Sequence, residues 1–333
     1  MRGAAAFALA VSASLLVLGP ASAQQSTTGA APPLVAPAPA LIPGGAPALA
    51  TAPGLTPSRA AAPAAGAAKS ASNKCDIPNA LGVSRTVEID TTGGPGFGFE
   101  HFKQLDFLRD HEVVLTFDDG PWPTTPSVLK ALAAECVKAI FFPIGKHATY
   151  YPEILKQVAA AGHSIGSHTW SHKDLSAIKS PDEAKAEIEK AISAVKWALG
   201  DEGQEAPFFR FPALRHPPEM VTYLGTRNIA IFSTDMDSFD FKMRKPDQVV
   251  KSVMAKLQKH GKGIVLMHDF QKATSEAVPQ LLAELKAGGY KIVHMKARGT
   301  VTSLPQYDEE LAKESKLPTV SQRPVSSVVR DVE

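Results

Sequence analysis

Residues 113–120 read Val113-Val114-Leu115-Thr116-Phe117-Asp118-Asp119-Gly120, and the rest of this 333-residue chain is best understood from them. The apolar, β-branched run predicts a buried strand that ends at two adjacent carboxylates. Like charges at the end of an apolar strand are costly unless positive groups neutralise them. Alone, Asp-Asp-Gly more often marks a turn whose Asp118 or Asp119 caps the next helix. Residues elsewhere in the chain have to distinguish the two interpretations.

The first 23 residues have the pattern of an export signal. Arg2 precedes an apolar run over residues 4–18, and Ala21-Ser22-Ala23 resembles a cleavage site. We expect residues 1–23 to be a cleaved signal peptide and the protein to be periplasmic or secreted; an uncleaved anchor is the alternative. No other segment reaches the roughly 20 apolar residues of a membrane helix, so no stable membrane insertion is expected after cleavage.

The remaining chain divides by composition. Residues 24–73 are mostly Ala, Pro, Gly, Ser and Thr, which predicts a disordered linker, because such a segment cannot bury a core. Residues 74–305 form the predicted domain, and residues 306–333 are expected to be a flexible C-terminal tail. The formal net charge is +2 without a basic block, so a nucleic-acid partner is not expected.

Apolar runs and helical patterns alternate about seven times along the domain. Strands are expected at 113–120, 139–143, 163–166, 207–211, 229–232, 263–267 and 291–295. Helices are expected at 127–136, 151–161, 181–199, 246–259 and 275–287. This α/β alternation with short connections is typical of a parallel sheet covered by helices, either open or closed into a barrel. In both cases active sites collect where the strands end.

Polar side chains occur where these strands end. His168 and His172 follow the third strand, Arg210 ends the fourth, and His268 follows the sixth. Two histidines four residues apart can face the same way, and with one carboxylate they form a two-His, one-Asp set that suits a divalent metal. A histidine pair alone is more often structural. Combined with the carboxylates at residues 118–119, the pair points to a metal site.

Five motifs in order resemble those of the polysaccharide deacetylases, the NodB-like enzymes of carbohydrate esterase family four. They are Thr116–Gly120, His168–His172, Arg210–Pro212, Asp237–Phe241 and Leu266–His268. The resemblance covers about Asp106 to Met295. It implies a distorted, TIM-barrel-like (β/α)7 barrel and metal-dependent removal of acetyl groups from sugars.

The resemblance also implies a metal site. Asp119, His168 and His172 match the family's metal ligands. The implied cofactor is a divalent metal, first of all Zn²⁺, with Co²⁺, Ni²⁺ or Mn²⁺ as alternatives. A metal in this position would polarise the acetyl carbonyl and lower the pKa of a water molecule.

The remaining motif residues match the family's catalytic residues. Asp118 would be the general base, held by Arg210, and His268 would be the general acid, oriented by Asp240. The oxyanion would be stabilised by the metal and by a backbone N–H, for which Ala213 is the candidate. His268 would protonate the departing amine or alkoxide.

The expected substrate-binding residues are Ala213, Leu266, Phe241 and Trp122. Leu266 would line the pocket for the acetyl methyl group, and Trp122 offers a stacking face. The chain departs from many relatives in having Ala213 in place of an aromatic residue and Phe241 in place of tryptophan. These departures leave the reaction intact but affect substrate preference.

The chain has two cysteines, Cys75 and Cys136. In an exported protein an even number favours a disulfide, although two buried thiols that never meet are the alternative. We expect the two to be joined.

Taken together, the sequence predicts an exported, metal-dependent deacetylase acting on N-acetylated amino-sugar glycans. Peptidoglycan, chitin-like oligomers and exopolysaccharide all remain open as substrates, and a monomer is expected. Two alternatives are kept: an O-acetyl polysaccharide esterase with the same machinery, and a catalytically silent carbohydrate-binding protein on the same fold.

Overall fold

The computed structural model describes residues 75–314. The predicted signal peptide, the predicted linker up to residue 73 and the part of the predicted tail beyond residue 314 lie outside the described residues. None of the helices within the described range is both long and apolar enough to span a bilayer.

All strand pairs are parallel, as the alternating pattern predicts. The larger sheet has the order β1 (Arg85–Ile89), β10 (Lys291–Ala297), β3 (Glu112–Asp118), β4 (Ile140–Phe142), β5 (Ser164–Ile165). On the other side of β3 it continues through β9 (Gly263–His268) to β8 (Met236–Asp237). The smaller sheet has the order β2 (Gly96–Phe97), β7 (Ala230–Phe232), β6 (Phe208–Phe209), and a single bridge, Ser167 to Phe209, joins it to the end of β5.

An irregular segment, rather than a strand ladder, brings the two sheets back together. After β7 the chain crosses to the start of β9, where the carbonyl of Ile264 accepts the Asp235 N–H at 3.0 Å and the Thr234 hydroxyl at 2.8 Å. The α/β class and the distorted barrel predicted from the sequence are therefore confirmed. Within residues 75–314 the strand hydrogen bonds form two sheets and do not run continuously around the barrel.

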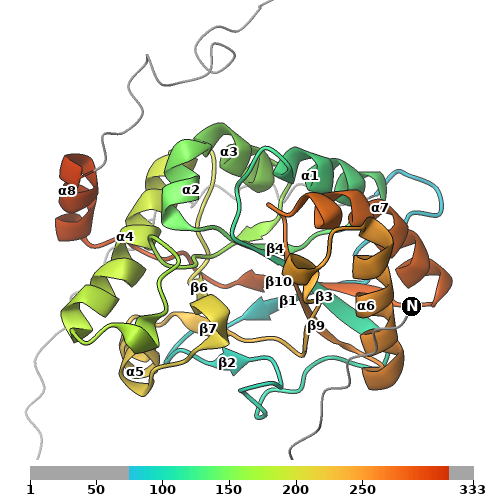
Figure 1. The fold of residues 1–333 in the computed structure, drawn as a ribbon, viewed down its shortest axis with the longest axis horizontal. Coiled ribbons are helices and arrows are strands. Elements are labelled where there is room, and N and C mark those ends of the chain that lie inside the picture. Colours follow the sequence, from blue (N-terminus) through green and yellow to red (C-terminus); the bar gives the residue numbers. More distant parts are fainter. Residues whose placement is uncertain (1–74, 315–333) are drawn as a thin grey trace, which may run out of the picture. The chain divides into compact units, whose positions relative to one another are not determined.

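Helices cover most of the outside of the strands, and loops lie beside β2 (Figure 1). The helices are α1 (Thr125–Ala134), α2 (Gly145–Tyr150), α3 (Pro152–Ala160), α4 (Pro181–Leu199), α5 (Pro218–Thr226), α6 (Pro246–His260), α7 (Lys272–Ala287) and α8 (Pro305–Glu314). The longest, α4, has the bounds predicted from its sequence. The Ser180 hydroxyl accepts the Glu183 N–H at 3.4 Å, Pro181 occupies the first turn, and Gly200 follows the last residue.

The structure corrects the predicted C-terminal boundary. Residues 306–314 were expected to belong to a flexible tail, but Pro305–Glu314 is a helix that packs on α4. Leu311 is buried there, and Lys190 forms an ion pair with Glu310 at 3.1 Å. The prediction was wrong because the helix is mostly polar and its one buried apolar residue gives no clear periodicity.

Strand β3 is buried on both faces, which explains its continuous apolar sequence. Leu115 and Phe117 pack against the helices, whereas Val114 faces the inner cluster that includes Phe142 and Phe232. Because side chains alternate along a strand, Thr116 and Asp118 lie on the same inner side as Val114. The first carboxylate of the Asp-Asp pair is therefore directed into the end of the barrel.

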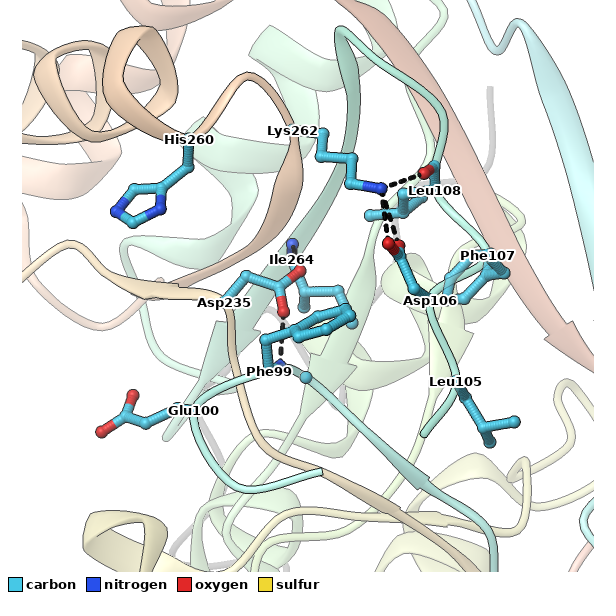
Figure 2. A pocket seen from close by; sticks show the side chains of 11 residues that line it. Phe99, Glu100, Leu105, Asp106, Phe107, Leu108, Asp235, His260, Lys262 and Ile264 are labelled. Atoms are coloured by element: carbon cyan, nitrogen blue, oxygen red, sulfur yellow. Dashed lines mark hydrogen bonds and ion pairs between the residues drawn. The ribbon is translucent and has the colours of Figure 1, made fainter. Parts of the chain in front are cut away.

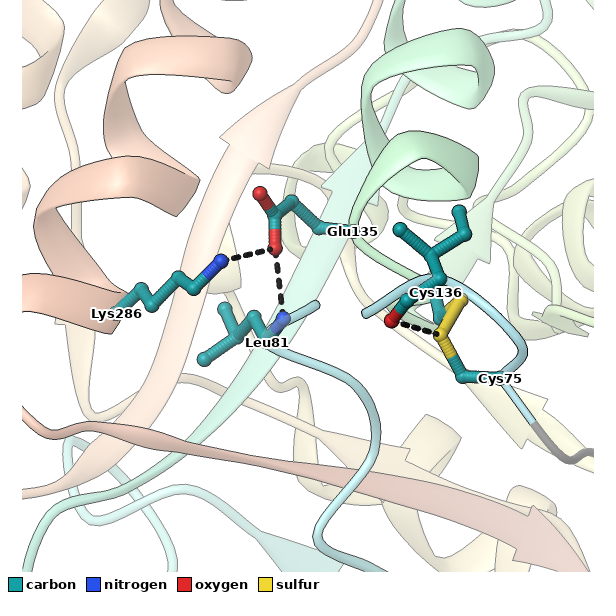
Figure 3. Close-up of a disulfide and its surroundings, with 6 residues drawn as sticks. Cys75, Leu81, Glu135, Cys136 and Lys286 are labelled. Atoms are coloured by element: carbon teal, nitrogen blue, oxygen red, sulfur yellow. Dashed lines mark hydrogen bonds and ion pairs between the residues drawn. A yellow bond between two sulfur atoms is a disulfide. The ribbon is translucent and has the colours of Figure 1, made fainter. Parts of the chain in front are cut away.

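The predicted disulfide is confirmed: Cys75 and Cys136 are joined across 61 residues (Figure 3). The bond attaches the arm before β1 to the end of α1. Glu135 strengthens this junction, because its carboxylate accepts the Leu81 N–H at 2.7 Å and pairs with Lys286 at 3.3 Å.

Candidate active site

Asp118 ends β3 in a fully buried ion pair. Its Oδ1 accepts a hydrogen bond from Arg210 Nη1 at 2.7 Å. The same nitrogen donates to the Thr116 hydroxyl at 2.7 Å, and Nη2 donates to the Ser233 carbonyl at 2.8 Å. Arg210 is thus fixed on several sides, so it holds the carboxylate in one position. Burial raises the pKa of Asp118, and the positive charge of Arg210 opposes that rise.

His268 lies beside Asp118 because β3 and β9 pair in register at these two residues. The ring of His268 donates from Nδ1 to Asp240 at 2.6 Å, and its backbone N–H donates to the other Asp240 oxygen at 2.7 Å. The Thr274 hydroxyl also donates to Asp240, at 2.6 Å. Burial lowers the pKa of His268, but the hydrogen bond and charge of Asp240 outweigh burial and raise it to about 9. The imidazole is therefore protonated at neutral pH.

Asp119, His168 and His172 converge as a candidate metal site. Asp119 Oδ1 lies 3.4 Å from His168 Nε2 and 3.3 Å from His172 Nε2. That oxygen is buried and has no hydrogen-bond partner in the described part of the chain. A buried carboxylate oxygen without a donor is costly, and a cation would satisfy it. One carboxylate and two imidazoles are ligands that zinc and similar divalent metals prefer, so the residues present fit such an ion.

The surroundings of His168 orient it for metal binding. Its Nδ1 lies 2.7 Å from the Arg210 carbonyl, which can only accept, so Nδ1 carries the proton and Nε2 presents a lone pair toward Asp119. Burial lowers the pKa of His168 to about 3, which keeps the ring neutral. Arg210 therefore positions Asp118 through its side chain and His168 through its backbone.

Glu187 anchors the segment that carries the two histidines, and sequence analysis did not single it out. From α4 its carboxylate accepts the Ser171 N–H at 2.9 Å and the Ser171 hydroxyl at 2.8 Å, and it pairs with Lys173 at 3.2 Å. Its one signal in the sequence is a carboxylate on the otherwise apolar face of a predicted helix.

Asp269 supports the Asp-Asp turn and was also missed as a functional residue. Its buried carboxylate accepts the Gly120 N–H at 3.0 Å and the Thr125 hydroxyl. A Cβ at residue 120 would lie 2.3 Å from Asp269 Oδ2, so this contact requires glycine. Burial raises the pKa of Asp269 to about 7, although the Thr125 hydroxyl opposes that rise.

His147 is a further missed residue, and it links the turn to an aromatic cluster. Its Nδ1 donates to the Asp119 carbonyl at 2.5 Å. Its ring centroid lies 4.8 Å from that of Trp122, which also contacts Tyr151 at 5.1 Å. Trp122 is partly exposed beside the turn that follows Asp119. The sequence predicts a stacking face for the substrate at this residue.

The other expected substrate-binding residues lie around the same site. Leu266 is buried two residues before His268 and on the same side of β9. The Phe241 ring lies 5.7 Å from the His268 ring and is half exposed. Ala213 is exposed and has a left-handed backbone (φ 52°, ψ 23°), as does Leu214 (φ 54°). Two successive non-glycine residues in this conformation are strained, which is common where backbone groups are positioned for function.

A separate cavity of about 470 Å³ lies at the opposite end of β9 (Figure 2). Three of the charged groups that line it, Asp106, Asp235 and Lys262, are paired with protein atoms. Lys262 contacts Asp106 at 2.7 Å, and the Asp235 carboxylate accepts the N–H groups of Phe99 and Ile264, each at 2.6 Å. The contacts of Asp235 belong to the segment that closes the barrel, whereas the candidate metal ligands and proton-transfer residues lie at the other end of β9.

Comparisons with known proteins agree with this site. The family model for polysaccharide deacetylase matches residues 108–229. The chitooligosaccharide deacetylase of Sinorhizobium fredii is 31% identical over 212 residues, which cover 57% of this chain and 96% of that protein. The peptidoglycan-N-acetylglucosamine deacetylase PgdA of Listeria monocytogenes is 34% identical over 188 residues, 54% of this chain. The matched part spans only 37% of PgdA, so much of that relative has no counterpart in the comparison.

Among solved structures, the peptidoglycan deacetylase Bd3279 of Bdellovibrio bacteriovorus superposes with a TM-score of 0.58 at 35% identity. The match covers 65% of this chain and 59% of that one. The structural match thus covers somewhat more of this chain than the 57% of the sequence match with the Sinorhizobium fredii protein. On these grounds the chain belongs to the polysaccharide deacetylase family.

Proposed function

We propose that this protein is an exported, metal-dependent N-deacetylase that hydrolyses acetyl groups from an amino-sugar glycan. One observation carries the proposal: two preorganised proton-transfer pairs flank one candidate metal site. Asp118, paired with Arg210, has Oδ2 4.0 Å from His168 Nε2. His268, paired with Asp240, has Nε2 3.9 Å from Asp119 Oδ2.

Asp119, His168 and His172 would hold the metal. When bound, a divalent ion would supply Lewis acidity toward the acetyl carbonyl and would acidify a nearby water molecule. Zn²⁺ is the proposed ion, because two imidazoles and one carboxylate suit it well. These three residues leave Asp118 and His268 free for proton transfer.

Asp118 acts as the general base in this proposal. Its Oδ1 is occupied by Arg210, so its Oδ2, which faces the ligand set, is the oxygen that accepts the proton of the attacking water. Burial raises the pKa of this carboxyl, and the charge of Arg210 opposes that rise and so favours the ionised form. The backbone N–H of Ala213 is the proposed donor to the oxyanion.

His268 acts as the general acid. Asp240 holds Nδ1, so Nε2 is the atom that gives its proton to the sugar nitrogen as the C–N bond breaks. The products are acetate and a free amine. Leu266, beneath His268 on β9, is suited to contact the acetyl methyl group.

Export is part of the proposal, and the disulfide between Cys75 and Cys136 supports it, because disulfides persist in oxidising compartments. The relatives compared above are named for peptidoglycan and chitooligosaccharide substrates. Both are N-acetylated amino-sugar glycans, which supports that substrate class for this chain.

Acetate release tests the proposal. Purified protein is assayed on N-acetylglucosamine tetramer, on peptidoglycan and on an O-acetylated polysaccharide, with a chelator and with metal added back. We expect acetate from N-acetylated glycans, loss with chelator and recovery with Zn²⁺. Release from the O-acetylated polymer alone would establish the esterase alternative instead. Glycan binding without acetate release, in metal-loaded protein, would establish the silent binding protein.

A further inference from the structure

The segment Phe239–Lys245 forms a rim beside His268. Asp240 in this segment is buried and orients His268, but the exposed side chains of the rim have no part in the proton transfers proposed above. Phe239 and Phe241 are 40% and 49% exposed, and both are large and apolar. The Phe241 ring stands nearly perpendicular to the His268 ring, at 87°. Exposed aromatic residues next to a reacting group mark a contact surface, because the apolar C–H face of a sugar ring packs on such rings.

Lys242 places a positive charge on this rim. Its Nζ lies 4.6 Å from the Phe239 ring centroid and 5.3 Å from that of Phe241. The two rings hold the ammonium group close to them, so less conformational freedom is lost when it binds an anion. Lys242 has no salt bridge to any carboxylate within residues 75–314.

Two further cations follow in the same segment. Arg244 and Lys245 are exposed, and neither has a salt bridge within the described range. The next carboxylate along the chain, Asp247, pairs with Lys251 at 3.3 Å. The rim therefore carries three cations whose charge the described protein does not neutralise.

Lys256 lies beside the same Phe239 ring as Lys242, but its hydrogen bonds give it a structural role. Its Nζ also lies near the Phe239 ring, at 4.4 Å, but it donates to the Asp237 carbonyl at 2.5 Å and to the Ser252 hydroxyl at 3.1 Å. The bond to Asp237 connects α6 to the end of β8, directly before the rim. The Nζ of Lys242 has no such bonds to protein atoms in the part of the chain that is described.

We propose that Phe239–Lys245 is a subsite for a sugar that carries a carboxylate and lies next to the residue being deacetylated. This inference rests on the proposed function. The sugar ring would pack on Phe239 and Phe241, and its carboxylate would pair with Lys242, with Arg244 and Lys245 adding attraction. The substrate class is then an anionic amino-sugar glycan, in which the carboxylate is either a lactyl ether or a uronic acid.

The experiment compares glycans of equal length that differ in charge. They are N-acetylglucosamine tetramer, a glycan with alternating lactyl-bearing sugars, a glycan with alternating uronic acids, and the amidated form of each acidic glycan. We expect the KM to be about two- to fivefold lower for an acidic glycan than for its amide, the range of one exposed ion pair, with kcat unchanged. The preference should vanish in about 0.5 M salt.

Matched variants assign the effect to the rim. Lys242→Met should abolish the preference for the carboxylate and leave the tetramer unaffected, whereas Lys242→Arg should retain it. Lys259→Met removes the same charge near the other end of α6, about 20 Å away along the helix, and should change nothing. The lactyl and uronic glycans show which source of carboxylate the subsite takes.

Binding measurements keep the inference testable independently of turnover. The Asp118→Asn variant, titrated with each acidic glycan and its amide, should show the same preference in Kd. Equal affinity for acid and amide would overturn the subsite even if acetate is released. If Lys242→Met weakens the affinity for the neutral tetramer as much as the affinity for the acidic glycans, the subsite is also overturned. A charge preference without acetate release from any glycan would refute the proposed function and leave the subsite standing.

Discussion

At the scale of single residues, the pair of His268 and Asp240 gives the site a definite pH dependence. His268 acts as an acid only while protonated, and Asp240 raises its pKa to about 9 against the effect of burial. Activity should therefore be lost as the pH rises through the pKa of His268. A bound cation lowers that pKa, so the loss should begin below pH 9.

Asp240→Asn should move this basic limb to lower pH. Without the carboxylate, the pKa of His268 should fall toward the ordinary value of about 6.5, and burial should lower it further. The measurement is kcat/KM against pH at saturating metal, with Asp247→Asn as an exposed control. An unchanged basic limb in Asp240→Asn would show that another group limits the rate at high pH.

The sequence indicates which residues end the strands but not what supports them. Asp118 and His268 could be placed together, because parallel strands end at the same edge of a sheet. Asp269 directly follows His268, yet its contact is with Gly120, 149 residues away. His147 donates a hydrogen bond to the backbone carbonyl of Asp119, and no sequence pattern predicts a bond to a backbone carbonyl. Such supporting contacts depend on tertiary packing.

At the scale of elements, helix α4 holds the segment that carries the two histidines. Glu187 accepts two hydrogen bonds from Ser171, which lies between His168 and His172. Glu187→Ala should weaken metal affinity by about 10- to 100-fold, the usual effect of removing a residue that orients metal ligands. Competition with a metal indicator measures this affinity. Asp182→Asn, at an exposed position of the same helix, should leave it unchanged; equal losses in both variants would contradict the anchoring role.

Long, periodic elements could be predicted, whereas short ones could not. Helix α4 has the predicted bounds because its capping residues and apolar face agree. Strands β2 and β8 have two residues each, too few to show alternation, and helices α2 and α5 were not predicted. Helix α7 starts at Lys272, three residues before the start predicted at Ser275.

At the scale of the whole molecule, the disulfide fixes the arm before β1 to the barrel. Closing a loop with a sequence separation of 61 should contribute about 4 kcal/mol to the free energy of unfolding, according to the chain-entropy account. We expect a reductant to lower the urea midpoint of the wild-type protein. The double variant Cys75→Ser, Cys136→Ser should already have that lower midpoint and respond no further. If wild type and variant unfold at the same midpoint without reductant, the bond does not stabilise the fold.

The barrel as a whole could be predicted because strand–helix alternation constrains topology strongly. Its closure could not, because the irregular segment at residues 233–235 completes it with hydrogen bonds to Ile264 rather than with a ladder. The C-terminal boundary was wrong for a similar reason: α8 is held by contacts with α4 that leave little trace in its own sequence.

The division between metal ligands and proton-transfer residues is the central claim, and metal content measured beside the acetate release rate tests it most directly. His168→Ala, His172→Ala and Asp119→Ala should lose both metal and activity, with partial recovery in excess metal. His268→Ala should keep its metal while its rate falls by ~10²–10⁴, and Asp118→Asn should keep its metal with turnover nearly abolished. Loss of metal from His268→Ala, or full activity in Asp118→Asn, would contradict the account.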